Sequence, residues 1–334
     1  MTMAKLRMGI LGCGGMAGAH AGRFKANPDV EIVALCDVEL ARCEAFAKRH
    51  LDGIEPQPKL FTDPAKMYAA SALDGVAIVT PHTLHYEQGV QALEAGVNVL
   101  MEKPMVTDSD QAHLLAAKVA ETGKLLTIGY NTPCTPEFAY LRELIRADEL
   151  GKLELISGWL TQNWRRGTMG TWRQDPALSG GGQMYDSGAH LFNSLVWLVE
   201  EQVDEVQAFV DNVGTPVDIN GSVNVRFASG AFATIIVGGN CPSSGAGLML
   251  AFDNGRVEVD GWGGSWIRIW RGGEQVKYPP IEGQAGNPND NFVDAILGRA
   301  EPRTSVRNGI NQSELMDAIY ESARTGSVVK VKAR

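Results

Sequence analysis

Residues 180–198 read GGGQMYDSGAHLFNSLVWL and join three glycines to an acid and a base. Asp186 and His190 are four residues apart, so on a helix they would share one face. An imidazole can accept a hydroxyl proton near neutral pH, and a neighbouring carboxylate can orient the ring. The same spacing also occurs in solvated surface pairs. The two residues are therefore candidates for proton transfer that need support from the rest of the chain.

The residues that follow the three glycines predict an amphipathic helix. Asn193 and Trp197 would continue the face of Asp186 and His190. The apolar stripe would lie opposite, at Met184, Leu191, Leu195 and Leu198.

A second chemical pattern lies near the N-terminus, where residues 8–24 read MGILGCGGMAGAHAGRF. Gly12, Gly14 and Ala17 have the spacing of a dinucleotide fingerprint that follows a strand and opens a helix. The first glycine permits a tight turn, the second lets the backbone approach a pyrophosphate, and the helix N-terminus attracts the phosphates. The residues expected to contact the dinucleotide here are Gly12, Gly14, Gly15 and Met16.

Asp37 ends the next predicted strand, at the distance expected for a residue that binds the ribose hydroxyls of the adenosine. A carboxylate there would repel the 2′-phosphate of NADP by roughly 1 to 4 kcal/mol. The sequence therefore favours NAD. Arg42 could offset this repulsion, which leaves NADP as an alternative.

Two further turns follow predicted strands in the same half of the chain. They read TPHTLH at 80–85 and EKP at 102–104. Ligands of open parallel sheets lie outside the carboxyl ends of the strands, so Lys103 would reach the same crevice as the cofactor. The other residues expected to line the cofactor are Thr80, Pro81, His82, His85 and Glu102. A plain strand end, with Glu102 and Lys103 as a surface pair, is the alternative interpretation.

The order of predicted elements indicates an α/β protein with two domains. Over residues 1–125, short β-rich runs alternate with helical ones, which is typical of a doubly wound parallel sheet. Strands are expected at 5–11, 31–36, 75–80, 98–101 and 124–129, and helices at 15–27, 38–50, 82–96 and 108–123. Residues 126–334 carry longer strands joined by the turn residues ASG and DNG, which predict hairpins and a large, open, mainly antiparallel sheet. These strands are expected at 153–160, 204–212, 222–228, 232–239, 248–252, 256–261 and 265–270, with helices near 289–297 and 309–325.

Composition narrows the class of protein further. The chain has 334 residues, 44% of them hydrophobic, and a formal net charge of -9, so neither a membrane span nor a nucleic-acid partner is expected. Five irregularly spaced cysteines suit a reducing compartment, and the cytoplasm is the expected location. His82 and His85 form an isolated H-x-x-H without further ligands, so no metal site is expected.

These motifs together resemble the glucose-fructose oxidoreductase, inositol dehydrogenase and MocA family (Gfo/Idh/MocA). The resemblance rests on the fingerprint, TPHTLH, EKP and GGGQMYDSGAH in this order, and it extends to AIYESARTGSVVKV near the C-terminus. It implies an N-terminal Rossmann domain that binds NAD and a C-terminal α/β domain whose open sheet forms the contact of a homodimer or homotetramer. It also implies hydride transfer at a hydroxyl carbon of a sugar, sugar derivative or cyclitol.

The resemblance assigns catalytic roles to Lys103, Asp186 and His190. It implies that His190 takes the hydroxyl proton, that Lys103 donates a hydrogen bond to the same oxygen, and that Asp186 holds another hydroxyl and orients the imidazole. The glycines would let the chain pass close to the cofactor and substrate. Trp172 and Arg173 would close on the nicotinamide and the sugar.

The sequence departs from the family at two positions near the expected substrate. The substrate-binding residues implied are Lys103, Asn131, Asp186, His190 and Asn193. Many relatives have an aspartate where this chain has Asn193, and an N-x-R-F segment where it reads NTPCTP with Pro133 in place of the arginine. The identity of the sugar is therefore the least transferable property.

The segment WGGSWIRIW at 262–270 predicts a strand with Trp266, Arg268 and Trp270 on one face. Packing on a sheet face or a subunit interface is the favoured interpretation, and stacking on a sugar is the alternative.

Two other functions remain open at this stage. A glycosidase could use tightly held NAD for a transient oxidation, which would leave no net change in NADH. A non-catalytic NAD sensor would not need Lys103, Asp186 and His190 together.

Overall fold

The computed structural model describes residues 4–277, 281 and 286–331, and the chain forms two compact units. The first unit comprises the described part of Met1–Val106 together with Asp110–Gly129 and Asn287–Val306. The second comprises the described parts of Thr107–Ser109, Tyr130–Gly286 and Arg307–Arg334. No helix in the described part of the chain is both long enough and apolar enough to cross a membrane.

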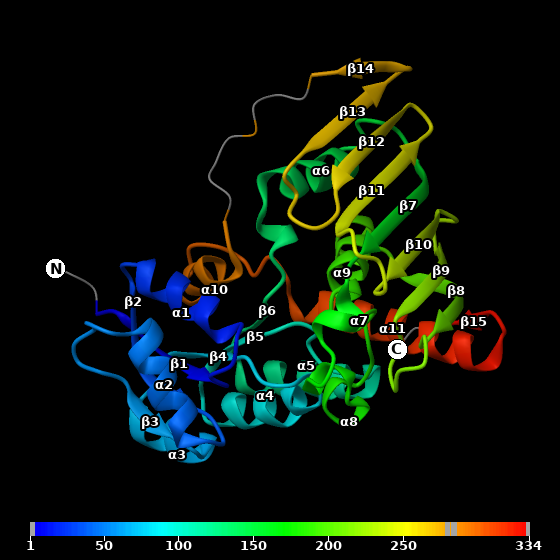
Figure 1. Ribbon diagram of the computed structural model, residues 1–334. Helices are drawn as coiled ribbons and strands as arrows, with labels where there is room; N and C mark the ends of the chain where they lie inside the picture. Colours follow the sequence, from blue (N-terminus) through cyan, green and yellow to red (C-terminus); the bar gives the residue numbers. More distant parts are fainter. Residues whose placement is uncertain (1–3, 278–280, 282–285, 332–334) are drawn as a thin grey trace. The chain divides into compact units, whose positions relative to one another are not determined.

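The first unit is built on a parallel sheet, as the sequence predicts (Figure 1). Within the described residues the sheet has six strands in the order β3-β2-β1-β4-β5-β6, and every neighbouring pair is parallel. This order reverses direction beside β1, as in a doubly wound dinucleotide-binding fold. The strands are β1 (Leu6–Leu11), β2 (Val30–Cys36), β3 (Lys59–Phe61), β4 (Gly75–Ile78), β5 (Asn98–Met101) and β6 (Leu126–Ile128).

Helices connect these strands. They are α1 (Ala17–Ala26), α2 (Leu40–His50), α3 (Pro64–Ser71), η1 (His82–Leu84), α4 (His85–Glu94) and α5 (Ser109–Thr122). Two of these elements, β3 and α3, are not among those that the sequence pattern predicts. β3 has three residues, too few to show a period of two, and α3 is marked mainly by its N-cap, Asp63, followed by Pro64.

The first unit also receives a late segment of the chain. Helix α10 (Pro288–Ile296) contacts α1, β5 and β6, and its Phe292 and Val293 are fully buried in the core that Met8 and Ile10 share. Because Asn287–Val306 belong to the first unit, a single domain boundary at residue 125 does not separate the two units completely.

The second unit is built on a large open sheet, mainly antiparallel as expected. Its described strands number nine, in the order β14-β13-β12-β11-β7-β10-β9-β8-β15, and β7 and β10 are the one parallel pair among them. The ASG and DNG links form the expected β9–β10 and β11–β12 hairpins. The strands are β7 (Leu153–Thr161), β8 (Val203–Asp211), β9 (Asn220–Phe227), β10 (Phe232–Gly238), β11 (Gly245–Phe252), β12 (Gly255–Asp260), β13 (Ile267–Arg271), β14 (Glu274–Val276) and β15 (Val329–Lys330).

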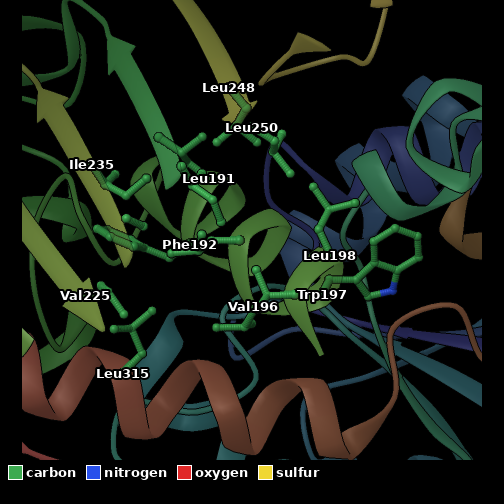
Figure 2. Close-up of a cluster of buried hydrophobic side chains, with 14 of the residues drawn as sticks. Leu191, Phe192, Val196, Trp197, Leu198, Val225, Ile235, Leu248, Leu250 and Leu315 are labelled. Carbon is green, nitrogen blue, oxygen red and sulfur yellow. The ribbon is translucent and has the colours of Figure 1, made fainter. Parts of the chain in front are cut away.

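Helices pack on one face of this sheet, and the other face carries exposed side chains in the part of the chain that the structure describes. The helices and turns of this part of the chain are η2 (Thr132–Cys134), α6 (Pro136–Arg146), α7 (Trp164–Gly167), η3 (Trp172–Gln174), α8 (Pro176–Ser179), α9 (Gly188–Val199) and α11 (Val306–Thr325). In Figure 2, Leu191, Phe192 and Val196 of α9 lie between Ile235 of β10 and Leu315 of α11. Every residue of α9 is buried, so the helix is surrounded by the core and has no solvated face.

The open face of the sheet carries apolar side chains in register. Phe209 pairs with Ser222, which pairs with Ile236, and Ile236 pairs with Trp159. The aromatic and aliphatic members of this row are all exposed. We refer to Phe209, Ile236 and Trp159 as the apolar row. Guanidinium groups also stack on tryptophans in β13 and just before it: Arg256 over Trp270 and Arg268 over Trp266.

Glu200 joins the end of α9 to α6. It adopts a left-handed conformation at the C-cap of α9, with φ 56°, and accepts hydrogen bonds from Arg142 and Arg146. Burial alone would raise the pKa of Glu200, but these hydrogen bonds outweigh it and lower the pKa from 4.5 to about 2. The ionised form is thus favoured in the folded protein, and the stabilisation is present above pH 4.5 and lost as the pH falls toward 2.

We therefore expect Glu200→Gln to lower the free energy of unfolding at neutral pH, with the difference from wild type shrinking below about pH 4.5. Urea denaturation between about pH 7 and pH 3 measures this difference. Glu143→Gln is the matched control, because Glu143 is exposed and pairs with one of the two arginines, Arg146. A Glu200→Gln deficit that stays constant down to pH 3 would contradict this account.

Candidate functional site

The glycine loop after β1 leaves room for a ligand. Gly12 has φ 93°, and a Cβ there would lie 2.6 Å from the carbonyl oxygen of Val79. At Gly14 and Gly15 a Cβ would meet no atom within 4 Å among the described residues. No side chain caps the N-terminus of α1 at Met16. The loop therefore combines a turn that requires glycine with open backbone and uncapped amides, which suits a bound pyrophosphate.

Asp37 is fixed against this loop. Its Oδ2 accepts a hydrogen bond of 2.9 Å from the Cys13 amide, and its Oδ1 accepts one of 3.2 Å from the Glu39 amide. Arg42 forms an ion pair of 2.7 Å with Glu39. The guanidinium that could have offset the charge of Asp37 is thus engaged by a different carboxylate.

His85 braces the turns after β4 and β5. Its Nδ1 lies 2.8 Å from the carbonyl oxygen of Pro104, and its Nε2 lies 3.0 Å from that of Thr80. Its ring is fully buried, and burial lowers its pKa. His82 is also buried, with its ring centroid 5.9 Å from that of His85. The histidine pair therefore supports the turns from within, while Thr80 and Pro81 remain partly exposed.

A buried polar network lies behind Lys103. His20 of α1 places Nε2 2.8 Å from Glu102 Oε1 and Nδ1 3.1 Å from Asn289 Oδ1. Glu102 Oε2 accepts a hydrogen bond of 3.1 Å from the Lys103 amide. Local sequence patterns do not indicate His20 or Asn289, because His20 meets Glu102 across 82 residues and Asn289 across 269. The network ties the backbone of Lys103 to α1 and α10.

In the second unit, the glycine run is shaped by Asp218. The carboxylate of Asp218 accepts hydrogen bonds from the amides of Gly182 at 2.6 Å and Met184 at 2.8 Å, and from the Tyr320 hydroxyl at 2.5 Å. A Cβ at Gly182 would overlap the carbonyl oxygen of Asp218. Gly180 has φ 72°. The glycines are thus explained by contacts within the protein, and burial raises the pKa of Asp218 despite its three donors.

Asp186 lies in the turn between this run and α9. The helix predicted to follow the glycines and to include Asp186 is wrong at its start, because α9 begins at Gly188 and Asp186 precedes it. Asp186 Oδ2 accepts hydrogen bonds from Trp164 Nε1 at 2.7 Å and Arg173 Nε at 3.0 Å. The Arg173 guanidinium lies 4.5 Å above the ring of Trp172. Asp186 therefore anchors the segment that contains Trp172 and Arg173.

His190 lies in the first turn of α9 between two aromatic rings. The Tyr130 ring meets it edge-on with centroids 5.5 Å apart, and the Trp262 ring lies 4.8 Å away at a tilt of 51°. Only 9% of His190 is exposed. These contacts fix the imidazole, and sequence reasoning missed both aromatic partners.

Asn193 is fully buried one turn after His190, and its amide nitrogen and oxygen have no hydrogen-bond partner among the described residues. Asn131 lies just before η2 and is partly exposed. Of the expected catalytic residues, the structure places Asp186 and His190 in the second unit and Lys103 in the first.

Comparison with known proteins assigns the chain to a family. The model described as "Oxidoreductase family, NAD-binding Rossmann fold" matches residues 6–130, and the GFO/IDH/MocA C-terminal domain model matches residues 138–267. The chain belongs to the Gfo/Idh/MocA oxidoreductase family. The resemblance inferred from the motifs is confirmed, as is the NAD-binding Rossmann domain.

Curated relatives include dehydrogenases of sugars and inositol. D-glucoside 3-dehydrogenase from Escherichia coli is 29% identical over 60% of this chain and 55% of its own length. Inositol 2-dehydrogenase 4 from Saccharopolyspora erythraea is 28% identical over 85% of this chain and 83% of its own. The match to the first of these thus spans little more than half of that enzyme.

Solved structures share the whole fold. Aldose-aldose oxidoreductase from Caulobacter crescentus, complexed with glycerol, has a TM-score of 0.84 at 25% identity and covers 98% of this chain and 99% of its own. The WlbA dehydrogenase from Bordetella pertussis, in complex with NADH and UDP-GlcNAcA, has a TM-score of 0.87 at 24% identity, covering 99% and 100%. The likeness to WlbA is evidence for the fold alone.

Proposed function

We propose that this oxidoreductase is an NAD-dependent dehydrogenase or reductase acting on a hydroxyl carbon of a sugar, sugar derivative or inositol. The observation that carries the proposal is the imidazole of His190, fixed between two aromatic rings four residues after the anchored carboxylate of Asp186, in a chain that also has an open dinucleotide loop. Relatives named for sugar and inositol oxidation support the substrate class.

The first unit supplies the groups that would hold the cofactor. The amides of Gly14, Gly15 and Met16 would bind the pyrophosphate, and Asp37 would bind the adenosine ribose. Thr80, Pro81 and Glu102, at the carboxyl ends of β4 and β5, would lie toward the nicotinamide, and Trp172 and Arg173 are proposed to close on it. Bound NAD supplies the acceptor or donor of the hydride at C4 of its nicotinamide ring.

The residues of this chain would manage the proton and the orientation of the substrate. His190 accepts the proton of the reacting hydroxyl during oxidation and returns it during reduction. Lys103 donates a hydrogen bond to the same oxygen and so favours its deprotonated form. Asp186 holds a second hydroxyl, and Asn131 and the unsatisfied amide of Asn193 are proposed to bind others.

Substrate screening tests the proposed function directly. We expect at least one member of a panel of monosaccharides, inositols and simple glycosides to change NADH fluorescence on turnover. Cleavage of a glycoside with no net change in NADH would instead support a glycosidase that uses NAD transiently. No change with any compound would contradict both functions.

We predict that His190→Ala lowers kcat by about 100- to 10,000-fold, because the reacting hydroxyl loses its proton acceptor. Steady-state kinetics with the best compound of the panel measures this loss. His113→Ala, on α5, is the control and should retain wild-type turnover. Near-normal turnover by His190→Ala would remove His190 from the proposed role.

We predict that Asp37→Ser shifts the ratio of kcat/KM for NADP over NAD upward by about tenfold or more, because the repulsion of the 2′-phosphate is removed. Asp52→Ser, at an exposed loop position, should leave the ratio unchanged. Wild-type preference for NADP would overturn the assignment of NAD as the working cofactor.

We also propose that the chain forms a homodimer or homotetramer through the open face of its large sheet. The apolar row supports this, since an exposed row of aromatic and aliphatic side chains is typical of a surface that a partner covers. Light scattering should give a multiple of the 36.0 kDa chain mass, and Ile236→Asp should give 36.0 kDa. Leu40→Asp, at an equally exposed apolar position on α2, is the control. A wild-type monomer would contradict the proposal.

The cysteines support a reducing compartment. All five are free thiols, with Cys13 Sγ 3.7 Å from Cys43 Sγ. We therefore propose that the protein works in the cytoplasm.

A further inference from the structure

Trp262 is an exposed aromatic residue in contact with the proposed proton acceptor. It lies in the link between β12 and β13, and 41% of its surface is exposed although its ring packs beside that of His190. Trp262 therefore combines a solvent-accessible surface with a ring contact to the one histidine to which the proposed function assigns chemistry.

The link that carries Trp262 is held in a defined conformation. Asp260 Oδ1 accepts a hydrogen bond of 3.0 Å from the Trp262 amide, and Oδ2 accepts bonds from the amide and hydroxyl of Ser265 at 3.1 Å and 2.7 Å. Burial alone would raise the pKa of Asp260, but these bonds lower it overall. Gly264 has φ 63°, and a Cβ there would lie 2.5 Å from Thr135 Oγ1. The loop is thus tied to β12 and packed against the start of α6.

Trp266, which lies in the same link, differs from Trp262 because an arginine covers a face of its ring. Trp266 is 39% exposed, close to the value for Trp262, but the guanidinium of Arg268 lies over its ring at 5.0 Å. Among the described residues, no cation lies over the Trp262 ring in this way, and its ring contact is with His190. The two residues have similar exposure and different neighbours.

The chemistry of a sugar ring matches this arrangement. One face of a pyranose or cyclitol presents mainly C–H groups, and these pack on the face of an aromatic ring while the hydroxyls point outward to polar groups. We propose that Trp262 is a substrate-binding residue whose indole stacks on the C–H face of the sugar or cyclitol ring whose reacting hydroxyl His190 deprotonates. This inference rests on the proposed function and adds the surface that selects a ring-shaped substrate.

The test compares Trp262→Ala, Trp262→Phe and the matched control Trp266→Ala. Kinetics with myo-inositol, D-glucose and methyl β-D-glucopyranoside should show KM rising by about tenfold for Trp262→Ala, with kcat within about threefold of wild type. Trp262→Phe should recover most of the affinity because it keeps an aromatic face. Trp266→Ala should leave both constants unchanged.

Calorimetric titration of the NADH-bound proteins with the same three compounds gives a readout that does not depend on turnover. If wild type binds a compound and Trp262→Ala loses about tenfold in affinity, the inference stands even where no turnover occurs and the proposed function fails. If wild type turns a compound over and Trp262→Ala keeps its KM, the inference is wrong while the proposed function stands. A loss confined to kcat would show that Trp262 acts only by positioning His190, and this result would also overturn the inference. If wild type neither binds nor turns over any of the three, the inference is wrong for the ring class that it names.

Discussion

The carboxylate of Asp218 is the constraint on which the second unit's functional residues depend. A buried charge is tolerated only where donors surround it, and Asp218 has the amides of Gly182 and Met184 and the hydroxyl of Tyr320. These bonds set the path of the backbone that leads to Asp186 and α9. Glycine is required at 182 because a side chain would occupy the place of the Asp218 carbonyl oxygen. The backbone that leads to Asp186 and His190 is therefore held by contacts within the protein.

The first unit applies the same principle to Lys103. His20, Glu102 and Asn289 form a buried chain of hydrogen bonds that ends on the Lys103 amide, and His85 joins the neighbouring turns through two carbonyl oxygens. Groups that react with a substrate must be held within a fraction of an ångström, and side chains fixed by hydrogen bonds achieve this. In each unit, buried polar residues hold the backbone of the residues to which chemistry is assigned.

Local pattern predicted the architecture of each unit well. The glycine fingerprint, the alternation of strands and helices and the ASG and DNG hairpins all appear as expected, because each depends on residues that are near in sequence. Periodicity could not show that Asp186 lies outside α9, since spacing alone does not mark where a helix begins. The buried residues that position the candidate site could not be predicted from local patterns either. Asp218 meets Tyr320 across 102 residues and His20 meets Asn289 across 269, and a single sequence carries no sign of such pairs.

The central claim is that Lys103, Asp186 and His190 act on one substrate beside the nicotinamide. A crystal structure of the protein with NAD and the best sugar or inositol of the panel tests it most directly. The account predicts that one ligand hydroxyl lies within hydrogen-bond distance of both the His190 ring and the Lys103 ammonium group, on the carbon nearest C4 of the nicotinamide. A bound substrate whose carbon nearest C4 carries a hydroxyl that contacts neither His190 nor Lys103 would contradict it.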